Sequence, residues 1–265
     1  MIRCEKEFLE SSSTFYGAIP RVMGTRLEML ISGSSEEDAS RLWDWLCVEA
    51  FHLDSILDRF NPVSELSALN SCDGWMEVSE TLASVLGAAA RFHSLTDGLF
   101  DVAGGGMDEV ETDGNRRARL NGHRLDFGGM AKGYLLKSFG DRLAWSGVKS
   151  AFVDFGSSSI LTVGTHPFGD CWKVGIRDPF GVGTFAEVEL RGSAMSTSGN
   201  TPSYGSHIMD PRTGKPVEGR RQVVVIADDA LAAEVLSTTL MIAGEEQGKG
   251  ILTRFPGVEV RMFGE

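Results

Sequence analysis

The sequence contains few cysteines, and their positions do not form a metal-binding pattern. Structural zinc sites are built from closely spaced Cys and His residues. No CxxC pair and no Cys/His cluster occurs here, and the four cysteines are scattered at Cys4, Cys47, Cys72 and Cys171. A thiolate metal centre is therefore not expected.

Long apolar runs are also missing. A membrane-spanning helix needs roughly 18 or more consecutive apolar residues, and no window of the sequence approaches that length. The N-terminal segment MIRCEKEFLE is charged throughout and lacks the apolar core of a signal peptide. We expect a soluble protein in a reducing compartment, cytoplasmic as the sequence stands and periplasmic only if an export segment has been removed.

Basic residues are outnumbered by acidic ones. The chain has 25 Lys and Arg against 37 Asp and Glu, which gives a formal net charge of −12. This balance argues against binding nucleic acid or an anionic membrane surface through charge alone. A phosphate ligand would need local help from backbone N–H groups at a helix start, from a lysine or from a bound cation. The oligomeric state is not determined by the sequence.

Glycine, in contrast, is abundant: 32 of 265 residues, without a repeat period. Helical spacing of apolar residues predicts helices at 35–60, 80–96, 130–146, 228–243 and 245–254, and a turn followed by a short helix is expected over 61–70. Strands are expected at 26–33, in a meander from SAFVDFG through FAEVEL that ends near Met195, in RQVVVIA and in VEVRMF, with loop and hairpin over 196–217.

Strands and helices mix without a regular βαβ rhythm, which favours an α+β fold with mixed, mainly antiparallel sheets and flanking helices. We expect one domain over residues 1–265, or two intimately packed α+β subdomains. Both arrangements are compatible with the length of the chain.

The stretch LDFGGMAKGYLL (125–136) places three glycines and a lysine between a strand end and a helix. Its main-chain N–H groups are open to a phosphate, and Lys132 would supply a point charge. The spacing matches neither the P-loop nor the dinucleotide-binding motif. A tight turn with a solvated lysine explains the same residues, and Asp126 could contact a ligand or cap the turn.

The helix 228–243 gives a sharper argument, because its apolar residues surround nearly the whole helical wheel and predict burial. Glu234, Ser237 and Thr238 then lie on an interior face. A buried ionised carboxylate requires a cation, a basic side chain or a network of donors. A hard divalent ion held by oxygen ligands would satisfy Glu234, and an ordinary salt bridge or polar seam would do so as well.

Two further stretches are weaker signals. SHIMDPRTGKPV has the Asp-Pro and Thr-Gly pairs of a β-turn, and His207 beside it is a candidate acid, base or phosphate contact. In LTDGLFD, Asp97 and Gly98 form a turn, and Asp101 is either structural or ligand-binding.

Taken in order, these stretches resemble the ApbE family of FAD:protein FMN transferases. Seven segments carry the resemblance: MGT (23–25), NPVSELSALN (61–70), TDGLFDV (96–102), LDFGGMAKGY (125–134), TSGN (197–200), HIMDPRTGKPV (207–217) and AEVLST (233–238). The resemblance implies an α+β fold that binds FAD and Mg²⁺ and transfers FMN from FAD to a Thr or Ser hydroxyl of a target flavoprotein.

The resemblance also implies roles for individual residues. FAD contacts would come from Met23, Phe60, Leu99, Phe100, Asp101, Asp126, Lys132 and Met209. The magnesium would be held by the main-chain oxygen of Gly129, by Glu234 and Thr238, and by Ser237 as a further candidate. His207, Asp210 and Lys132 would serve the reacting phosphates as catalytic residues.

Two alternatives stay open. One is an FAD pyrophosphatase that releases FMN and AMP, and the other is a non-catalytic FAD-binding module. They stay open because this chain has Glu234 where the family's metal helix usually has aspartate, and because the segment between Asp101 and Asp126 is shorter than in typical members.

Overall fold

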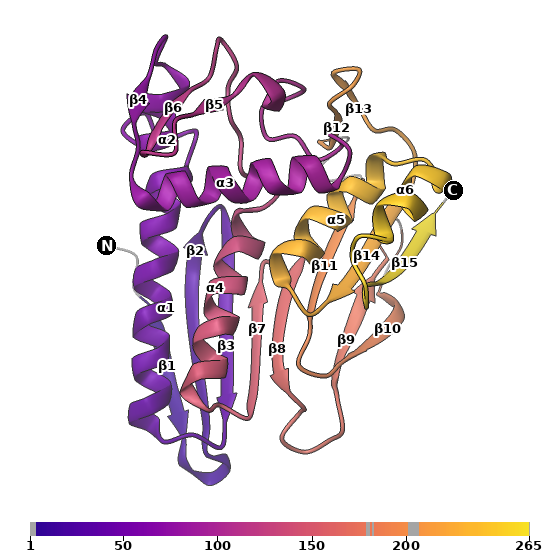
Figure 1. The fold of residues 1–265 in the computed structure, drawn as a ribbon. Coiled ribbons are helices and arrows are strands. Elements are labelled where there is room, and N and C mark those ends of the chain that lie inside the picture. The colour runs from indigo at the N-terminus through magenta and orange to yellow at the C-terminus, as the bar shows by residue number, and fades with distance from the viewer. Residues whose placement is uncertain (1–3, 179–180, 182, 201–206, 265) are drawn as a thin grey trace.

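The computed structural model describes residues 4–178, 181, 183–200 and 207–264, and its centre is one eight-stranded sheet (Figure 1). Every adjacent pair of strands in this sheet is antiparallel. The strand order is β1 (Glu5–Leu9), β2 (Thr14–Val22), β3 (Thr25–Ser32), β7 (Ser150–Phe155), β8 (Ser159–Gly164), β11 (Ala194–Gly199), β14 (Arg221–Ala227) and β15 (Glu259–Gly264).

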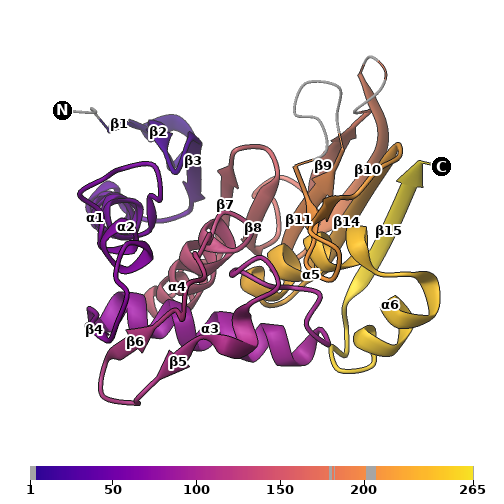
Figure 2. The same ribbon diagram turned by 90° about the horizontal axis from the view of Figure 1, so that it is seen from above.

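The helices cover one face of this sheet (Figures 1 and 2). They are α1 (Glu36–Leu57), α2 (Glu65–Asn70), α3 (Glu80–Leu95), α4 (Ala131–Ser146), α5 (Ala230–Ile242) and α6 (Glu245–Leu252). The sequence predicted each of them within a few residues. In Figure 2, α4 and α5 lie side by side over the middle of the sheet, where α5 also contacts β11 and β14.

Local sequence explains where two of these helices begin. Ser35 accepts a hydrogen bond from the Asp38 N–H, and acidic residues fill the first turn of α1, which suits the positive end of the helix dipole. Asp229 caps α5 by accepting from the Leu231 and Ala232 N–H groups. All but two residues of α5 are buried, as the wheel of apolar residues predicted.

A two-stranded ribbon covers the other face of the sheet. It consists of β9 (Trp172–Arg177) and β10 (Thr184–Leu190). Its apolar side chains share a hydrophobic cluster with Ile160, Met195 and Val224 of the main sheet, and Figure 2 shows it on the side opposite the helices. The expected meander was therefore wrong in part, because β9 and β10 leave the sheet and β8 pairs with β11.

Short elements gather at the upper end of the sheet in Figure 1, beside α3. They are β4 (Met76–Glu77), β5 (Glu111–Thr112), β6 (Arg117–Arg119) and the hairpin of β12 (Met209–Asp210) and β13 (Lys215–Pro216). The 3-10 turns η1 (Glu10–Ser12) and η2 (Met107–Glu109) complete the fold.

The prediction of loop over 196–217 was wrong at its start, because residues 196–199 belong to β11. The Ser- and Gly-rich composition is typical of a loop, but here the hydroxyl groups find partners on α5. The rest of the segment is the β12–β13 hairpin and its flanks, while the prediction for 201–206 lies outside the described residues.

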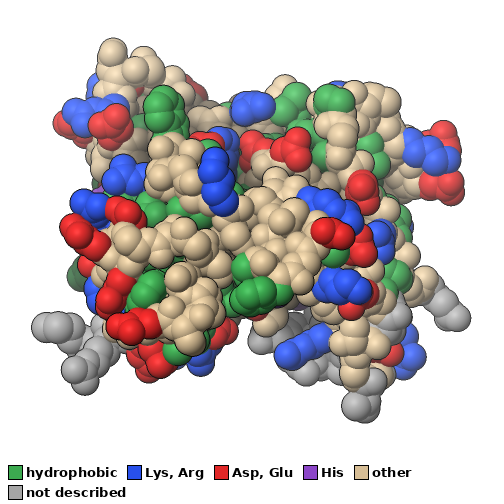
Figure 3. Space-filling view, turned by 90° about the horizontal axis from the view of Figure 1, so that it is seen from below, with side chains coloured by type: hydrophobic (Ala, Val, Ile, Leu, Met, Phe, Trp, Pro, Cys, Tyr) green, Lys and Arg blue, Asp and Glu red, His purple; other side chains and the backbone are tan. Residues whose placement is uncertain are grey.

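One large hydrophobic cluster includes side chains from Phe15 to Val235, so the two halves of the chain share a core. The division into one domain or two subdomains stays a prediction. The lower face of the molecule carries acidic and basic side chains interspersed with apolar ones (Figure 3). No helix in the described part of the chain is long and apolar enough to cross a bilayer.

Candidate functional site

The Glu234 carboxylate lies at the centre of a buried polar cluster between α4, α5 and the sheet. The residue is 4% exposed. Lys132 Nζ, from the first turn of α4, donates to Oε1. The hydroxyl of Ser159 donates to Oε2, and that of Ser196 donates to the same oxygen at 3.2 Å. The buried carboxylate is thus paired with one ammonium group and two hydroxyl donors.

A chain of hydroxyl groups continues from the carboxylate along α5. The Ser237 Oγ lies 3.1 Å from the Ser196 Oγ and 2.8 Å from the Ser198 Oγ. The Ser198 Oγ in turn lies 3.3 Å from Thr238 Oγ1. The residues predicted from the helix, Glu234, Ser237 and Thr238, are therefore brought together with two serines of β11.

Two glycines of LDFGGMAKGYLL lie at close approaches between elements, for different reasons. A Cβ on Gly133 would lie 2.6 Å from the Glu234 Cβ and 2.9 Å from the Ala230 carbonyl oxygen, so α4 and α5 touch here only because residue 133 has no side chain. A Cβ on Gly129 would lie 3.5 Å from the Phe100 ring and 3.9 Å from Thr238 Oγ1. The turn thus borders the hydroxyl cluster.

Asp126 holds the same turn and reaches a basic side chain. Its N–H donates to the Val102 carbonyl at 2.8 Å, and its carboxylate accepts from the Gly128 N–H at 2.9 Å. The carboxylate also pairs with Arg59 at 2.9 Å. The Arg59 guanidinium lies 4.6 Å from the centroid of the Phe60 ring, and Phe60 is 81% exposed. Asp126 and Phe60 are therefore linked through Arg59.

The loop that follows α3 carries three predicted flavin contacts: Leu99 and Phe100 are buried, and the Asp101 side chain is 2% exposed. Leu99 packs in a second hydrophobic cluster and Phe100 in the main one. Asp101 accepts hydrogen bonds from the Ala103 N–H at 2.6 Å and the Met107 N–H at 3.2 Å. Asp101 therefore has a structural role in shaping this loop, whatever its role toward a ligand.

The hairpin with His207, Met209 and Asp210 lies next to that loop. A Cβ on Gly105 would lie 2.5 Å from the Pro211 carbonyl oxygen, so the two segments are in direct contact. Arg212 donates to both carboxylate oxygens of Asp210, and this holds the pKa of Asp210 below its ordinary value. His207 and Met209 are exposed.

Met23 occupies a tight turn between β2 and β3, with a φ of 47°. Its N–H donates to the Asp54 carboxylate at 3.1 Å. Among the described residues, no hydrogen bond joins Met23 or Met209 to Glu234. The flavin and catalytic roles of the predicted residues stay predictions.

Sequence reasoning missed Ser159, Ser196 and Ser198 as partners of the buried cluster, and Arg59 as the partner of Asp126. Ser196 and Ser198 lie in a segment whose composition is typical of a loop, whereas Ser159 begins a strand of the predicted meander. The sequence did indicate that a buried Glu234 carboxylate needs hydrogen-bond donors. It does not indicate which distant segment of the chain supplies them.

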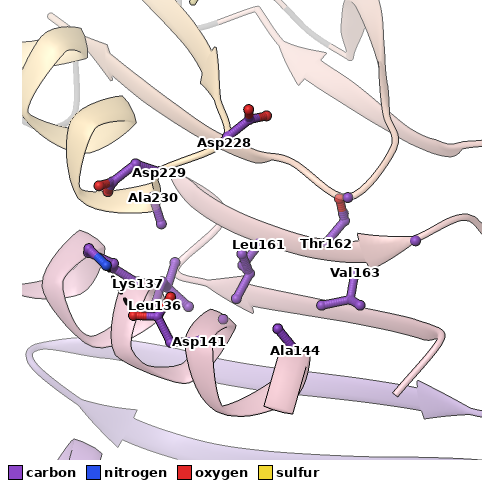
Figure 4. Close-up of a pocket in the computed structure, with 13 residues that line it drawn as sticks. Leu136, Lys137, Asp141, Ala144, Leu161, Thr162, Val163, Asp228, Asp229 and Ala230 are labelled. Carbon is purple, nitrogen blue, oxygen red and sulfur yellow. Dashed lines mark hydrogen bonds and ion pairs between the residues drawn. The ribbon is translucent and has the colours of Figure 1, made fainter. Parts of the chain in front are cut away.

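A cavity of about 450 Å³ lies between α4, β8 and the turn before α5 (Figure 4). Lys137 and Asp141, which pair at 3.0 Å across one turn of α4, line it together with Leu161 and Asp228. None of the predicted flavin or metal residues lines this cavity. It is therefore separate from the Glu234 cluster.

The comparison with family models matches residues 23–115 and 104–262 to the model described as the ApbE family. The chain belongs to the ApbE family. An FAD:protein FMN transferase of Rhodobacter capsulatus is 30% identical over 280 residues, covering 89% of this chain and 52% of that protein. That of Salmonella typhimurium is 25% identical, covering 88% of this chain and 80% of its own. The chain thus spans about half the length of the first ApbE relative and most of the second.

Solved ApbE structures share the fold. The ApbE protein of Thermotoga maritima matches with a TM-score of 0.80 at 22% identity, covering 100% of this chain and 97% of that one. The Pseudomonas stutzeri flavinyl transferase ApbE in its apo form matches with a TM-score of 0.80 at 24% identity, covering 99% and 92%. These matches confirm the α+β, ApbE-like fold.

Proposed function

We propose that this chain transfers FMN from FAD to a Thr or Ser hydroxyl of a target flavoprotein, with Mg²⁺ as the metal cofactor. The observation that carries the proposal is the buried Glu234 cluster at the glycine turn, within a chain of the ApbE family. It combines a carboxylate, a lysine and a row of hydroxyl groups beside the main chain of Gly129.

The donor set of this cluster fits Mg²⁺. The ion prefers oxygen ligands and is commonly bound through one or two carboxylates together with substrate phosphates. Glu234 supplies one carboxylate, Thr238 and Ser237 supply hydroxyls, and Gly129 supplies a main-chain oxygen. No group of three or more His, Cys, Asp or Glu side chains suited to a metal exists among the described residues, so phosphate oxygens of FAD would have to complete the set.

In the proposed reaction the acceptor hydroxyl attacks the FMN phosphorus of the FAD pyrophosphate. The bond to the bridging oxygen breaks, AMP leaves with that oxygen, and the hydroxyl proton is lost to a base or to solvent. Bound Mg²⁺ would supply positive charge to the pyrophosphate. The Lys132 ammonium would neutralise part of the same charge, and Asp126 and Phe60 would orient the nucleotide.

The hairpin supplies the remaining catalytic candidates. The hydrogen bonds from Arg212 lower the pKa of Asp210, which suits a carboxylate that accepts a hydrogen bond rather than one that takes up a proton. His207 lies three residues before Asp210 on the same segment. Since the hairpin contacts the loop of Phe100 and Asp101 through Gly105 and Pro211, these groups would close one side of the nucleotide site.

The experiment is incubation of the chain with FAD and Mg²⁺, with and without a candidate acceptor. The acceptor is read by intact mass and the nucleotides by chromatography. Transfer predicts an FMN mass increment on the acceptor and release of AMP. Free FMN and AMP without acceptor would indicate the pyrophosphatase alternative, and intact FAD in all samples would indicate the non-catalytic binder.

A variant of the central carboxylate sharpens the experiment. Glu234→Gln should lower turnover by about 100-fold or more, because it removes the carboxylate that would hold Mg²⁺, and with it the positive charge that would stabilise the transition state. Glu245→Gln, on the exposed first turn of α6, is the matched control and should keep the wild-type rate. Equal activity of both variants would contradict the proposed site.

A further inference from the structure

The two oxygens of the Glu234 carboxylate have different kinds of partner. Oε2 accepts from the hydroxyls of Ser159 and Ser196, which belong to strands β8 and β11 of the central sheet. Oε1 has one partner among the described residues, the Lys132 ammonium. One oxygen is therefore anchored to the sheet, while the other is held by the end of a long and flexible side chain.

The Lys132 ammonium lies at the position where a divalent cation bound to Glu234 would be expected. Glu234 and Thr238 are four residues apart on α5 and share one face of the helix. The Thr238 hydroxyl lies near Gly129 and the Ser198 hydroxyl. A divalent ion that used these groups would take Oε1, since Oε2 is already saturated by two donors. An ammonium group and a divalent ion on one oxygen would repel each other strongly in this low-dielectric setting.

We propose that Lys132 serves as an internal substitute for the metal ion. The ammonium neutralises Glu234 in the metal-free protein, and Mg²⁺ displaces it from Oε1 when it binds. The inference rests on the magnesium site of the proposed function. The Lys132 side chain is 18% exposed, against 6% for Glu234, so the released ammonium has a route toward solvent.

The exchange would couple two events at the site. Without metal, the buried carboxylate keeps a counter-charge, which a buried anion requires. With metal, the same lysine becomes free for the phosphate groups of FAD. Lys132 would then have an inhibitory effect on metal binding in the absence of nucleotide, which a residue that only contacts FAD would not have.

The test compares Mg²⁺ binding to FAD-free, chelator-treated wild type and Lys132→Met by titration calorimetry and by thermal shift. The variant should bind Mg²⁺ at least tenfold more tightly than wild type, and its melting temperature should rise more on saturation. Lys137→Met is the matched control: it lies on the same helix, pairs with the exposed Asp141, and should bind like wild type. Equal or weaker binding by Lys132→Met, or no binding, overturns the proposal.

A second measurement uses wild-type protein and does not depend on the stability of the variant. Acylation of lysines by acetic anhydride, mapped by peptide mass, should label Lys132 slowly without Mg²⁺ and severalfold faster at saturating Mg²⁺. Lys137 should not change. Labelling of Lys132 that is independent of Mg²⁺ overturns the exchange. Absence of FMN transfer by wild type would contradict the proposed function, whereas these binding results would still decide the role of Lys132.

Discussion

Gly133→Ala should destabilise the protein and impair its site, although alanine is the better helix former. The added Cβ would lie 2.6 Å from the Glu234 Cβ, 2.9 Å from the Ala230 carbonyl oxygen and 3.1 Å from the Leu231 Cα. Two of these atoms are main chain and the third is fixed to it, so none can move without shifting α5. Overpacking of this kind costs about 1 to 3 kcal/mol.

The higher helix propensity of alanine partly offsets the cost of overpacking. Gly to Ala inside a helix favours folding by roughly 1 kcal/mol. Because backbone atoms cause the clash, we take the upper part of the overpacking range, and the net loss becomes about 2 kcal/mol. For a chain of this size, a loss of 1 kcal/mol in the free energy of unfolding lowers the melting temperature by roughly 2 to 4 °C. The melting temperature of Gly133→Ala should therefore fall by several degrees.

Gly140→Ala on the same helix is the control. Its Cβ would meet only the methyl carbons of Leu161 at 3.5 Å, an ordinary contact, so the substitution should be neutral or stabilising by up to about 1 kcal/mol. Urea unfolding followed by circular dichroism measures both variants. If Gly133→Ala is as stable as Gly140→Ala, the close approach of α4 and α5 is not the reason for glycine at 133.

Two further predictions concern other parts of the molecule. Phe60→Ala should raise the KM for FAD about fivefold or more, since stacking on an aromatic ring contributes roughly 1 to 3 kcal/mol, and should leave the melting temperature nearly unchanged because the ring is 81% exposed; an unchanged KM contradicts its flavin contact. Burial raises the pKa of Asp154 above its ordinary value of 3.8, so the folded state binds its proton more tightly than the unfolded state. Wild type should therefore gain stability relative to Asp154→Asn as the pH falls from 7 through the raised pKa toward 3.8. Urea unfolding at a series of pH values tests this, and a difference that does not vary with pH refutes the burial effect.

The helices could be predicted from sequence because each carries its own signal. In α5, the apolar residues around the whole wheel correctly predicted burial, and with it the buried state of Glu234. In α1, the spacing of apolar residues after a Ser- and Glu-rich start predicted a helix over 35–60, and the structure has this helix over Glu36–Leu57. These signals lie within the helix sequence itself, so they can be recognised without knowing which elements pack against the helix.

The strands with polar side chains could not be predicted in the same way. β11 contains Ser196 and Ser198, whose hydroxyls are satisfied by Glu234 and Ser237 about 40 residues further along the chain. Nothing within the strand indicates that such partners exist. The first strand, β1, was not predicted because its side chains are mostly exposed and it shows no clear apolar alternation.

The paired glycine and lysine at positions 133 and 132 join the packing of the fold to the chemistry of the site. Gly133 allows α4 to approach α5 at Glu234, and the approach brings the neighbouring Lys132 ammonium within hydrogen-bonding reach of the carboxylate. A bulkier residue at 133 would therefore separate the two charges as well as the two helices. Gly133→Ala should therefore lower the stability of the protein and weaken the ion pair between Lys132 and Glu234 at the same time. Lys132→Met should instead alter the metal affinity and leave the contact between α4 and α5 in place.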